Sequence, residues 1–226
     1  MTTDPQAFLA QAAKLNPAKI CGLSTPEAVT AALEGQAAFV GFVFFAKSPR
    51  NIDPDAAGRL AAPARGRSQI VAVTVDPTDA ELDAVMAGLK PDLIQLHGHE
   101  GPNRVAEIGR RTGAGLIKVL SVREAGDLDG AKAYDGLVSH LMFDAKPPIG
   151  SDLPGGVGSR FDWSLMQGRV FQRPWFLAGG LDPWNVAEAF DQSGAPLVDV
   201  SSGVERGPGV KDPALISAFL SAVRRR

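Results

Sequence analysis

Short apolar runs rich in β-forming residues recur along the whole chain and constrain its fold more than any other feature of the sequence. There are eight of them, and most of the intervals between them have helix-forming character. Strands that alternate with helices are typical of parallel sheets whose strands are joined by crossover connections. The runs span residues 19–23, 39–45, 70–75, 93–97, 116–122, 137–144, 175–178 and 197–201.

Start signals for helices lie in several of the intervals. Thr25, Asp182 and Asp212 each precede a proline, which combines a capping side chain with a residue suited to the first helical turn. The weakest helix pattern covers 124–134, and a short additional helix is expected at 7–15, before the first strand. The other predicted helices span 26–33, 80–89, 104–111, 183–190 and 213–225.

Eight strand–helix units in 226 residues favour a closed (β/α)8 barrel of the TIM-barrel type over an open sheet. An open doubly wound sheet usually carries a glycine-rich turn after its first strand. That place holds Cys21-Gly22-Leu23-Ser24 instead. Because no internal repeat or low-complexity linker divides the chain, we predict a single α/β domain over residues 1–226.

The alternation of side chains along the strands predicts which residues point into the barrel. Successive side chains lie on opposite faces of a strand, and in four strands one face is polar while the other is apolar. The apolar face must pack against the helices, so the polar face points inward. Its last members then lie at the C-terminal mouth, where active sites of this fold are found. The inward pairs are Lys19 and Cys21, Gln95 and His97, Met142 and Asp144, and Asp199 and Ser201.

Composition and charge argue against several function classes. A net charge of −2 and a pI of about 5.9 do not suit a nucleic-acid surface or a polybasic membrane patch. No run of about 18 apolar residues suggests a membrane span, and the acidic start of the chain is unlike a signal peptide. Because Cys21 is the only cysteine, neither an internal disulfide nor a cysteine-based zinc cluster can form. We therefore expect a cytoplasmic protein.

Cys21 and Asp144 are the candidate catalytic residues. A free cysteine is most often a small buried hydrophobic residue, but Cys21 ends the first strand at the barrel mouth and shares its face with Lys19. A neighbouring cation lowers the pKa of a thiol and makes the thiolate available as a base. Asp144 ends the sixth strand, where it is either a solvated or capping acid or a general acid that acts in its protonated form.

Two further features suit the binding of an anionic substrate. Arg50 follows the second strand; most loop arginines are solvated, but a guanidinium held by the adjacent Ser-Pro turn can grip a carboxylate through two parallel hydrogen bonds. Glycines after the seventh and eighth strands can offer several backbone N–H groups to one phosphate, where this fold often binds phosphate. The candidate phosphate ligands are Gly179, Gly180, Ser202 and Gly203, with Gly156 from the glycine cluster at 154–158.

Other polar candidates lie around the mouth. We expect His97 and Lys19 to form part of the wall of the site. A metal site with His99 is the weaker alternative, because no further ligands are visible in the sequence. We therefore predict neither a metal nor a cofactor. The cluster at 154–158 is either a loop that covers the mouth or a simple flexible turn.

These residues lie in motifs that resemble the phosphoribosylanthranilate isomerase family from about residue 19 to the end of the chain. The motifs occur in the family's order, and each lies at a strand end, which makes the resemblance specific. The matching segments are 19–23 (KICGL), 41–45 (GFVFF), 47–50 (KSPR), 95–98 (QLHG), Asp144, 154–158 (PGGVG), 161–163 (FDW), 177–181 (LAGGL), 199–205 (DVSSGVE), 208–209 (PG) and 211–212 (KD).

The resemblance implies an isomerase of tryptophan biosynthesis that rearranges N-(5′-phosphoribosyl)anthranilate by general acid–base catalysis without a cofactor. It assigns the base to Cys21, the acid to Asp144 and the grip on the anthranilate carboxylate to Arg50. The glycine-rich ends of the seventh and eighth strands match the family's phosphate site. Family members begin close to the first strand, so residues 1–17 are expected to form an N-terminal extension.

Two alternatives remain at this point. One is another phosphosugar-binding barrel enzyme of the tryptophan or histidine pathways, and the other is a barrel that binds a phosphosugar without catalysis. An acid and a base at these strand ends favour the isomerase. The expected partner is a small phosphorylated molecule, with no nucleic acid and no membrane. A monomer is the default expectation, and a homodimer is the alternative.

Overall fold

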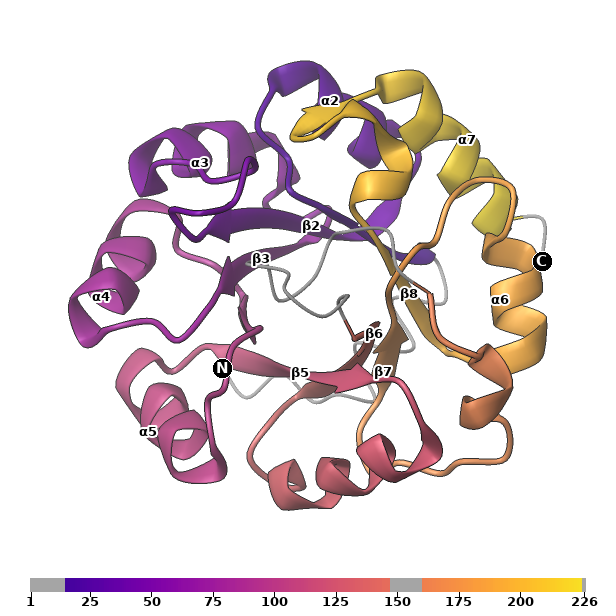
Figure 1. Ribbon diagram of the computed structural model, residues 1–226. Coiled ribbons are helices and arrows are strands. Elements are labelled where there is room, and N and C mark those ends of the chain that lie inside the picture. The colour runs from indigo at the N-terminus through magenta and orange to yellow at the C-terminus, as the bar shows by residue number, and fades with distance from the viewer. Residues whose placement is uncertain (1–14, 147–159, 225–226) are drawn as a thin grey trace.

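Eight parallel strands close into a barrel in the computed structural model, which describes residues 15–146 and 160–224 (Figure 1). Each strand pairs with the next in sequence, and β1 also pairs with β8, which completes the closure. The predicted (β/α)8 architecture is confirmed. The strands are β1 (Asn16–Cys21), β2 (Ala37–Phe44), β3 (Gln69–Thr74), β4 (Leu93–Leu96), β5 (Gly115–Val122), β6 (His140–Ala145), β7 (Trp175–Leu177) and β8 (Leu197–Val200).

Helices form a ring around the barrel (Figure 1). The α-helices are α2 (Pro26–Glu34), α3 (Pro54–Ala61), α4 (Asp79–Gly88), α5 (Pro102–Thr112), α6 (Val186–Ser193) and α7 (Pro213–Arg224). Short 3-10 helices are η1 (Ala62–Ala64), η2 (Ala125–Tyr134), η3 (Trp163–Met166) and η4 (Ser202–Val204). A small hairpin of β9 (Glu205–Gly207) and β10 (Val210–Lys211) follows η4 and precedes α7.

Two of the three predicted helix starts are confirmed. The hydroxyl of Thr25 accepts a backbone N–H of α2, and the carboxylate of Asp212 accepts one of α7. The third is wrong, because α6 begins only at Val186. Asp182 instead accepts the N–H groups of the second and third residues after it, which closes a turn before the helix. A capping residue followed by proline fits both arrangements, so the sequence signal alone cannot separate them.

Other helix boundaries differ from the sequence pattern in instructive ways. The weak helix expected at 124–134 is the 3-10 helix η2, and its two glycines, Gly126 and Gly130, disfavour an α-helix there. The sequence pattern does not predict helix α3, although Asp53 caps it through two hydrogen bonds. The helix expected at 7–15 falls almost entirely outside the described residues.

The first strand starts three residues earlier than expected, at Asn16. The buried Asn16 amide donates to the carbonyl oxygen of Gly35 at 2.7 Å and to that of Leu220 at 3.1 Å. These bonds tie the end of α2 and the C-terminal half of α7 to the start of β1. Asn16 and Pro17 therefore belong to β1 and to the barrel.

The barrel interior and the layer between strands and helices form separate hydrophobic cores. Phe39, Phe176 and Met142 belong to the inner core. Leu141 and Phe143, the neighbours of Met142 on β6, belong to the outer core. The predicted parity of this strand is therefore confirmed. With this parity, the last inward side chain of the strand lies at the barrel mouth.

Candidate active site

A pocket opens at the C-terminal ends of the barrel strands. Its position is where barrels of this fold carry their active sites. One part of the wall is apolar and includes Val43, Phe45 and Val73. The polar side chains that line it include Cys21, Arg50, Gln95, His97, Asp144 and Asp199.

Lys19 lies beneath this pocket and is fully buried. Its Nζ donates to Oδ1 of Asp199 at 2.8 Å across the pairing of β1 with β8. Gly41 on β2 makes room for the lysine, because a Cβ there would lie 3.0 Å from its Cε. Burial lowers the pKa of Lys19, but Asp199 and Cys21 outweigh burial and raise it to about 12. The expectation that Lys19 forms part of the pocket wall is wrong, because Asp199 holds it one layer below.

Cys21 ends β1 and is buried at the base of the pocket. Burial raises the pKa of its thiol above the ordinary value, and the Asp199 carboxylate adds to the rise. Lys19 and Lys211 act in the opposite direction without outweighing burial. The expectation of an acidified thiol is therefore wrong: the cation is present, but burial of the thiol outweighs its effect. Such a thiol is protonated at neutral pH, and its thiolate, once formed, is a stronger base.

Asp144 is the last residue but one of β6 and is buried at another part of the mouth, separated from β1 by β7 and β8. Its Oδ2 lies 3.2 Å from Nε2 of His97, a hydrogen-bond distance, although the angle is not that of a hydrogen bond. The Nε2 of Gln95 lies 3.2 Å from the Nδ1 of His97. If this amide donates, the neutral ring carries its proton on Nε2, facing Asp144. His97 can therefore orient the carboxylate.

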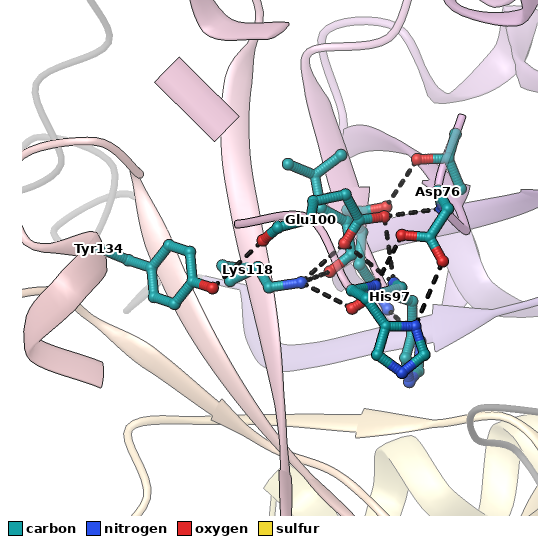
Figure 2. A network of polar contacts seen from close by, with 10 residues as sticks. Asp76, His97, Glu100, Lys118 and Tyr134 are labelled. Atoms are coloured by element: carbon teal, nitrogen blue, oxygen red, sulfur yellow. Dashed lines mark hydrogen bonds and ion pairs between the residues drawn. The ribbon is translucent and has the colours of Figure 1, made fainter. Parts of the chain in front are cut away.

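A buried network fixes the loop that carries His97 (Figure 2). Lys118 on β5 and Glu100 form an ion pair of 2.6 Å, and both side chains are almost fully buried. Glu100 also accepts the N–H groups of Asp76 at 2.8 Å and Gly98 at 3.0 Å. Lys118 donates to the carbonyl oxygen of Gly98 at 2.9 Å. The loops after β3 and β4 are thereby tied to β5 directly beside His97.

Arg50 lines the pocket from the loop after β2, and its guanidinium already holds a carboxylate. Its Nε and Nη2 donate to the two carboxylate oxygens of Glu205 at 2.7 and 2.8 Å. Both side chains are nearly buried. Arg50 thus lies at the pocket in a bidentate ion pair, and its predicted grip on a substrate carboxylate stays a prediction.

The glycine-rich strand ends meet at the rim of the pocket. Gly179 and Gly180 follow β7 with φ values of 90° and 63°, a backbone conformation that favours glycine. They line the pocket together with Ser202, and the N–H groups of these three residues donate to no atom of the described chain. Donors of this kind bind phosphate. Gly203 instead packs against the backbone of the β7 loop, and Gly156 lies outside the described residues.

The chain matches the family model described as N-(5′-phosphoribosyl)anthranilate (PRA) isomerase over residues 18–222. It belongs to this family. A protein of Caulobacter sp. (strain K31) named N-(5′-phosphoribosyl)anthranilate isomerase is 70% identical over 209 residues, covering 92% of this chain and 98% of that protein. A protein of Mesorhizobium japonicum with the same name is 52% identical over 206 residues, covering 91% and 94%.

Solved structures of the family have the same fold. The phosphoribosyl anthranilate isomerase of Thermotoga maritima superposes with a TM-score of 0.82 at 33% identity, covering 92% of this chain and 98% of that one. Another family structure, with a TM-score of 0.78 at 32% identity and the same coverage, is in complex with reduced 1-(o-carboxyphenylamino)-1-deoxyribulose 5-phosphate. The family assignment thus rests on sequence and on structure together.

Sequence reasoning missed two acidic residues that shape this family site. Strand parity puts Asp199 on the inward face of its strand but indicates no role for it, although it lines the pocket and holds Lys19. The sequence shows Glu205 only as part of a motif, yet it is the partner of Arg50. Strand parity could have found Asp199. It could not have found Glu205, because that residue lies beyond β8 in the small hairpin.

Searches for other site types give two negative findings for the described part of the chain. Within residues 15–146 and 160–224, no three His, Cys, Asp or Glu side chains are grouped in a way that could hold a metal ion. Within the same residues, no helix has the length and apolar character needed to cross a membrane.

Proposed function

We propose that the protein catalyses the Amadori rearrangement of N-(5′-phosphoribosyl)anthranilate to 1-(2-carboxyphenylamino)-1-deoxyribulose 5-phosphate in tryptophan biosynthesis. The observation that carries the proposal is one pocket lined by a thiol, a carboxylic acid, a guanidinium and a rim of backbone N–H donors. Each group suits one part of this substrate or one step of its reaction. The rearrangement needs proton transfers only, which a single acid and a single base can supply.

Asp144 is the proposed general acid. It would protonate the furanose ring oxygen, after which the bond between that oxygen and C1′ breaks. The nitrogen lone pair forms a double bond to C1′, which gives an open-chain Schiff base. The nearby Nε2 of His97, 3.2 Å from the Asp144 carboxylate, would orient the acid toward the ring oxygen.

Cys21 is the proposed general base. As thiolate it would remove the proton from C2′, and the electrons of that bond form the enolamine, which then becomes the ketone product. Since burial raises the pKa of the thiol, only a small fraction is ionised at neutral pH, but that fraction is a strong base. Lys19 would stabilise the thiolate from below, because its charge acts to lower the thiol pKa.

The remaining groups would hold the two charged ends of the substrate. Arg50 would bind the anthranilate carboxylate, and the N–H donors of Gly179, Gly180 and Ser202 would bind the phosphate. Fixing both ends sets the sugar between acid and base, and such positioning is worth several kcal/mol of barrier. The apolar wall that includes Val43 and Phe45 suits the aromatic ring.

We further propose that the chain acts in the cytoplasm as a single-domain monomer. Its single cysteine suits a reducing compartment. A family structure from Thermotoga maritima is described as derived from a dimeric enzyme, so a homodimer is the alternative. Light scattering of the purified protein separates the two: a mass near 23.7 kDa supports the monomer, and twice that mass contradicts it.

A fluorescence assay tests the proposed activity. The preceding enzyme would generate phosphoribosylanthranilate in place from anthranilate and phosphoribosyl pyrophosphate, and purified protein would be added while the fluorescence decay is followed. We expect rapid decay with the wild type, and losses of roughly 100-fold or more in kcat with Cys21→Ala and with Asp144→Asn. No decay with folded wild-type protein would contradict the activity, and near-normal decay with either variant would contradict that residue's role.

A further inference from the structure

Glu205 is the centre of a hydrogen-bonded cluster and has no part in the proposed proton transfers. Its two carboxylate oxygens accept four hydrogen bonds from three residues on two different loops. Two come from Nε and Nη2 of Arg50, at 2.7 and 2.8 Å. The others come from Nζ of Lys211 at 2.5 Å and from the N–H of Gly209 at 3.1 Å.

The hairpin that carries Glu205 is itself firmly anchored. The buried Nζ of Lys211 donates to the carbonyl oxygen of Ser201 at 2.9 Å and to its hydroxyl at 3.2 Å. The Ser201 hydroxyl in turn lies 3.3 Å from the carbonyl oxygen of Cys21 and donates to it. Glu205 is therefore fixed with respect to the end of β1, where the proposed base lies.

Two glycines let the Arg50 loop approach this hairpin closely. Gly209 has a φ of 78°, and a Cβ on it would lie 2.5 Å from the carbonyl oxygen of Pro49. Gly22, also with a φ of 78°, would bring a Cβ to 2.7 Å from Cδ of Arg50. Side chains at these positions would displace the loop. The arginine is therefore held by its backbone, its aliphatic stem and its guanidinium.

The carboxylate of Glu205 holds the guanidinium of Arg50 in place. Arg50 donates two hydrogen bonds to it, and Lys211 donates to the same carboxylate. The bidentate bond also restricts the planar guanidinium to one orientation, and an oriented guanidinium binds a carboxylate with less loss of side-chain entropy.

We propose that Glu205 is a positioning residue that aligns Arg50 for the aromatic carboxylate of the substrate and thereby makes the site specific for a carboxylated aryl group. This inference rests on the proposed function of Arg50. Glu205 acts through the arginine and touches no reacting atom. Its loss therefore weakens binding of the carboxylated substrate while leaving the proton transfers intact.

The test compares two substrates in the Glu205→Gln variant. One is N-(5′-phosphoribosyl)anthranilate, and the other is N-(5′-phosphoribosyl)aniline, which lacks the carboxylate and forms from ribose 5-phosphate and aniline. We expect KM for the first to rise about tenfold with kcat within about twofold, and kcat/KM for the second to stay at the wild-type value. Glu188→Gln, which removes an exposed carboxylate of α6, is the matched control. It should leave the kinetic constants for both substrates unchanged.

Further variants keep the test decisive. Glu205→Asp retains a negative charge beside Lys211 but withdraws it from Arg50. If the glutamine variant does not fold, the two substrates can be compared in this variant instead. In an Arg50→Ala background, Glu205→Gln should add no further rise in KM. Equal losses for both substrates would overturn the positioning role.

The Arg50→Ala variant alone separates this inference from the proposed function. If Arg50→Ala raises KM only for the carboxylated substrate, whereas Glu205→Gln leaves that KM unchanged, the arginine assignment stands and the inference fails. If it discriminates between the two substrates as the wild type does, the arginine assignment fails and the inference fails with it.

Discussion

Replacing Lys19 by methionine tests the electrostatic arrangement beneath the active site. The lysine is fully buried, and its Nζ contacts Asp199 at 2.8 Å. Methionine is of similar length and removes only the charge and the hydrogen bond. The carboxylate of Asp199, whose side chain is 10% exposed, then remains in a largely dry site without its cation. We therefore expect Lys19→Met to destabilise the fold and to slow the reaction.

The magnitude follows from the raised pKa of Lys19 and from the general cost of breaking a buried ion pair. One pKa unit corresponds to about 1.4 kcal/mol, so the rise of the Lys19 pKa from 10.5 to about 12 corresponds to about 2 kcal/mol in favour of the charged lysine in the folded state. Breaking a buried pair on one side costs about 3–5 kcal/mol. Because Asp199 also borders the pocket, water relieves part of this cost, and we expect about 3 kcal/mol.

Thermal and urea denaturation of the purified variant measure this loss. For a domain of this size, about 3 kcal/mol lowers Tm by roughly 6–12 °C. The double variant Lys19→Met/Asp199→Asn removes both charges and should recover most of the loss. A raised lysine pKa contributes its stability fully below the unfolded value of 10.5, and this contribution is lost as pH rises through about 12. The difference between wild type and variant should therefore shrink in that range.

Two outcomes would refute this reasoning. A loss below about 1 kcal/mol in Lys19→Met would mean that the pair contributes little to the fold. A double variant that is less stable than Lys19→Met would mean that the unpaired carboxylate of Asp199 is not the source of the loss. Enzyme activity provides a separate readout, because without Lys19 the pKa of the Cys21 thiol should rise further and kcat at neutral pH should fall.

Two further predictions concern buried titratable groups away from the reacting atoms. Burial lowers the pKa of His140 to about 4, so the free energy of unfolding should fall by about 3 kcal/mol as pH drops from 6.5 to 4. Urea denaturation should show that the free energy of unfolding depends less on pH in His140→Phe than in the wild type. The same pH dependence in both proteins would contradict the prediction. Glu100→Gln leaves Lys118 buried without its carboxylate and should cost about 3–5 kcal/mol. Hydrogen exchange of the Asp76 and Gly98 amides, which donate to Glu100, should accelerate in this variant, and unchanged exchange would argue against the network.

Strand parity is the reason why much of the site could be predicted from the sequence. A barrel strand with one apolar face leaves no choice about which side chains point inward. The last inward residue of such a strand must lie at the mouth. Cys21 on β1 and Asp144 on β6 both follow this rule, and both line the pocket. No knowledge of the tertiary structure was needed for either placement.

The environment of those residues could not be predicted in the same way. Lys19 and Asp199 are 180 positions apart and meet only because β1 and β8 close the barrel. The sequence shows the lysine beside Cys21 but not the carboxylate that pairs with it. It also does not show how deeply the thiol is buried, and burial is the main reason why the expected direction of the thiol pKa is wrong. Arg50 and Glu205 likewise meet across loops that no local pattern connects.

A deuterium isotope effect tests the central claim most directly, namely that Cys21 removes the C2′ proton and Asp144 opens the ring. Substrate deuterated at C2′ would be compared with ordinary substrate in the wild type, in Cys21→Ser and in Asp144→Asn. We predict a primary isotope effect on kcat in Cys21→Ser, because proton removal becomes rate-limiting, and none in Asp144→Asn, where ring opening limits the rate. An isotope effect confined to the Asp144 variant, or absent from the Cys21 variant, would contradict the account.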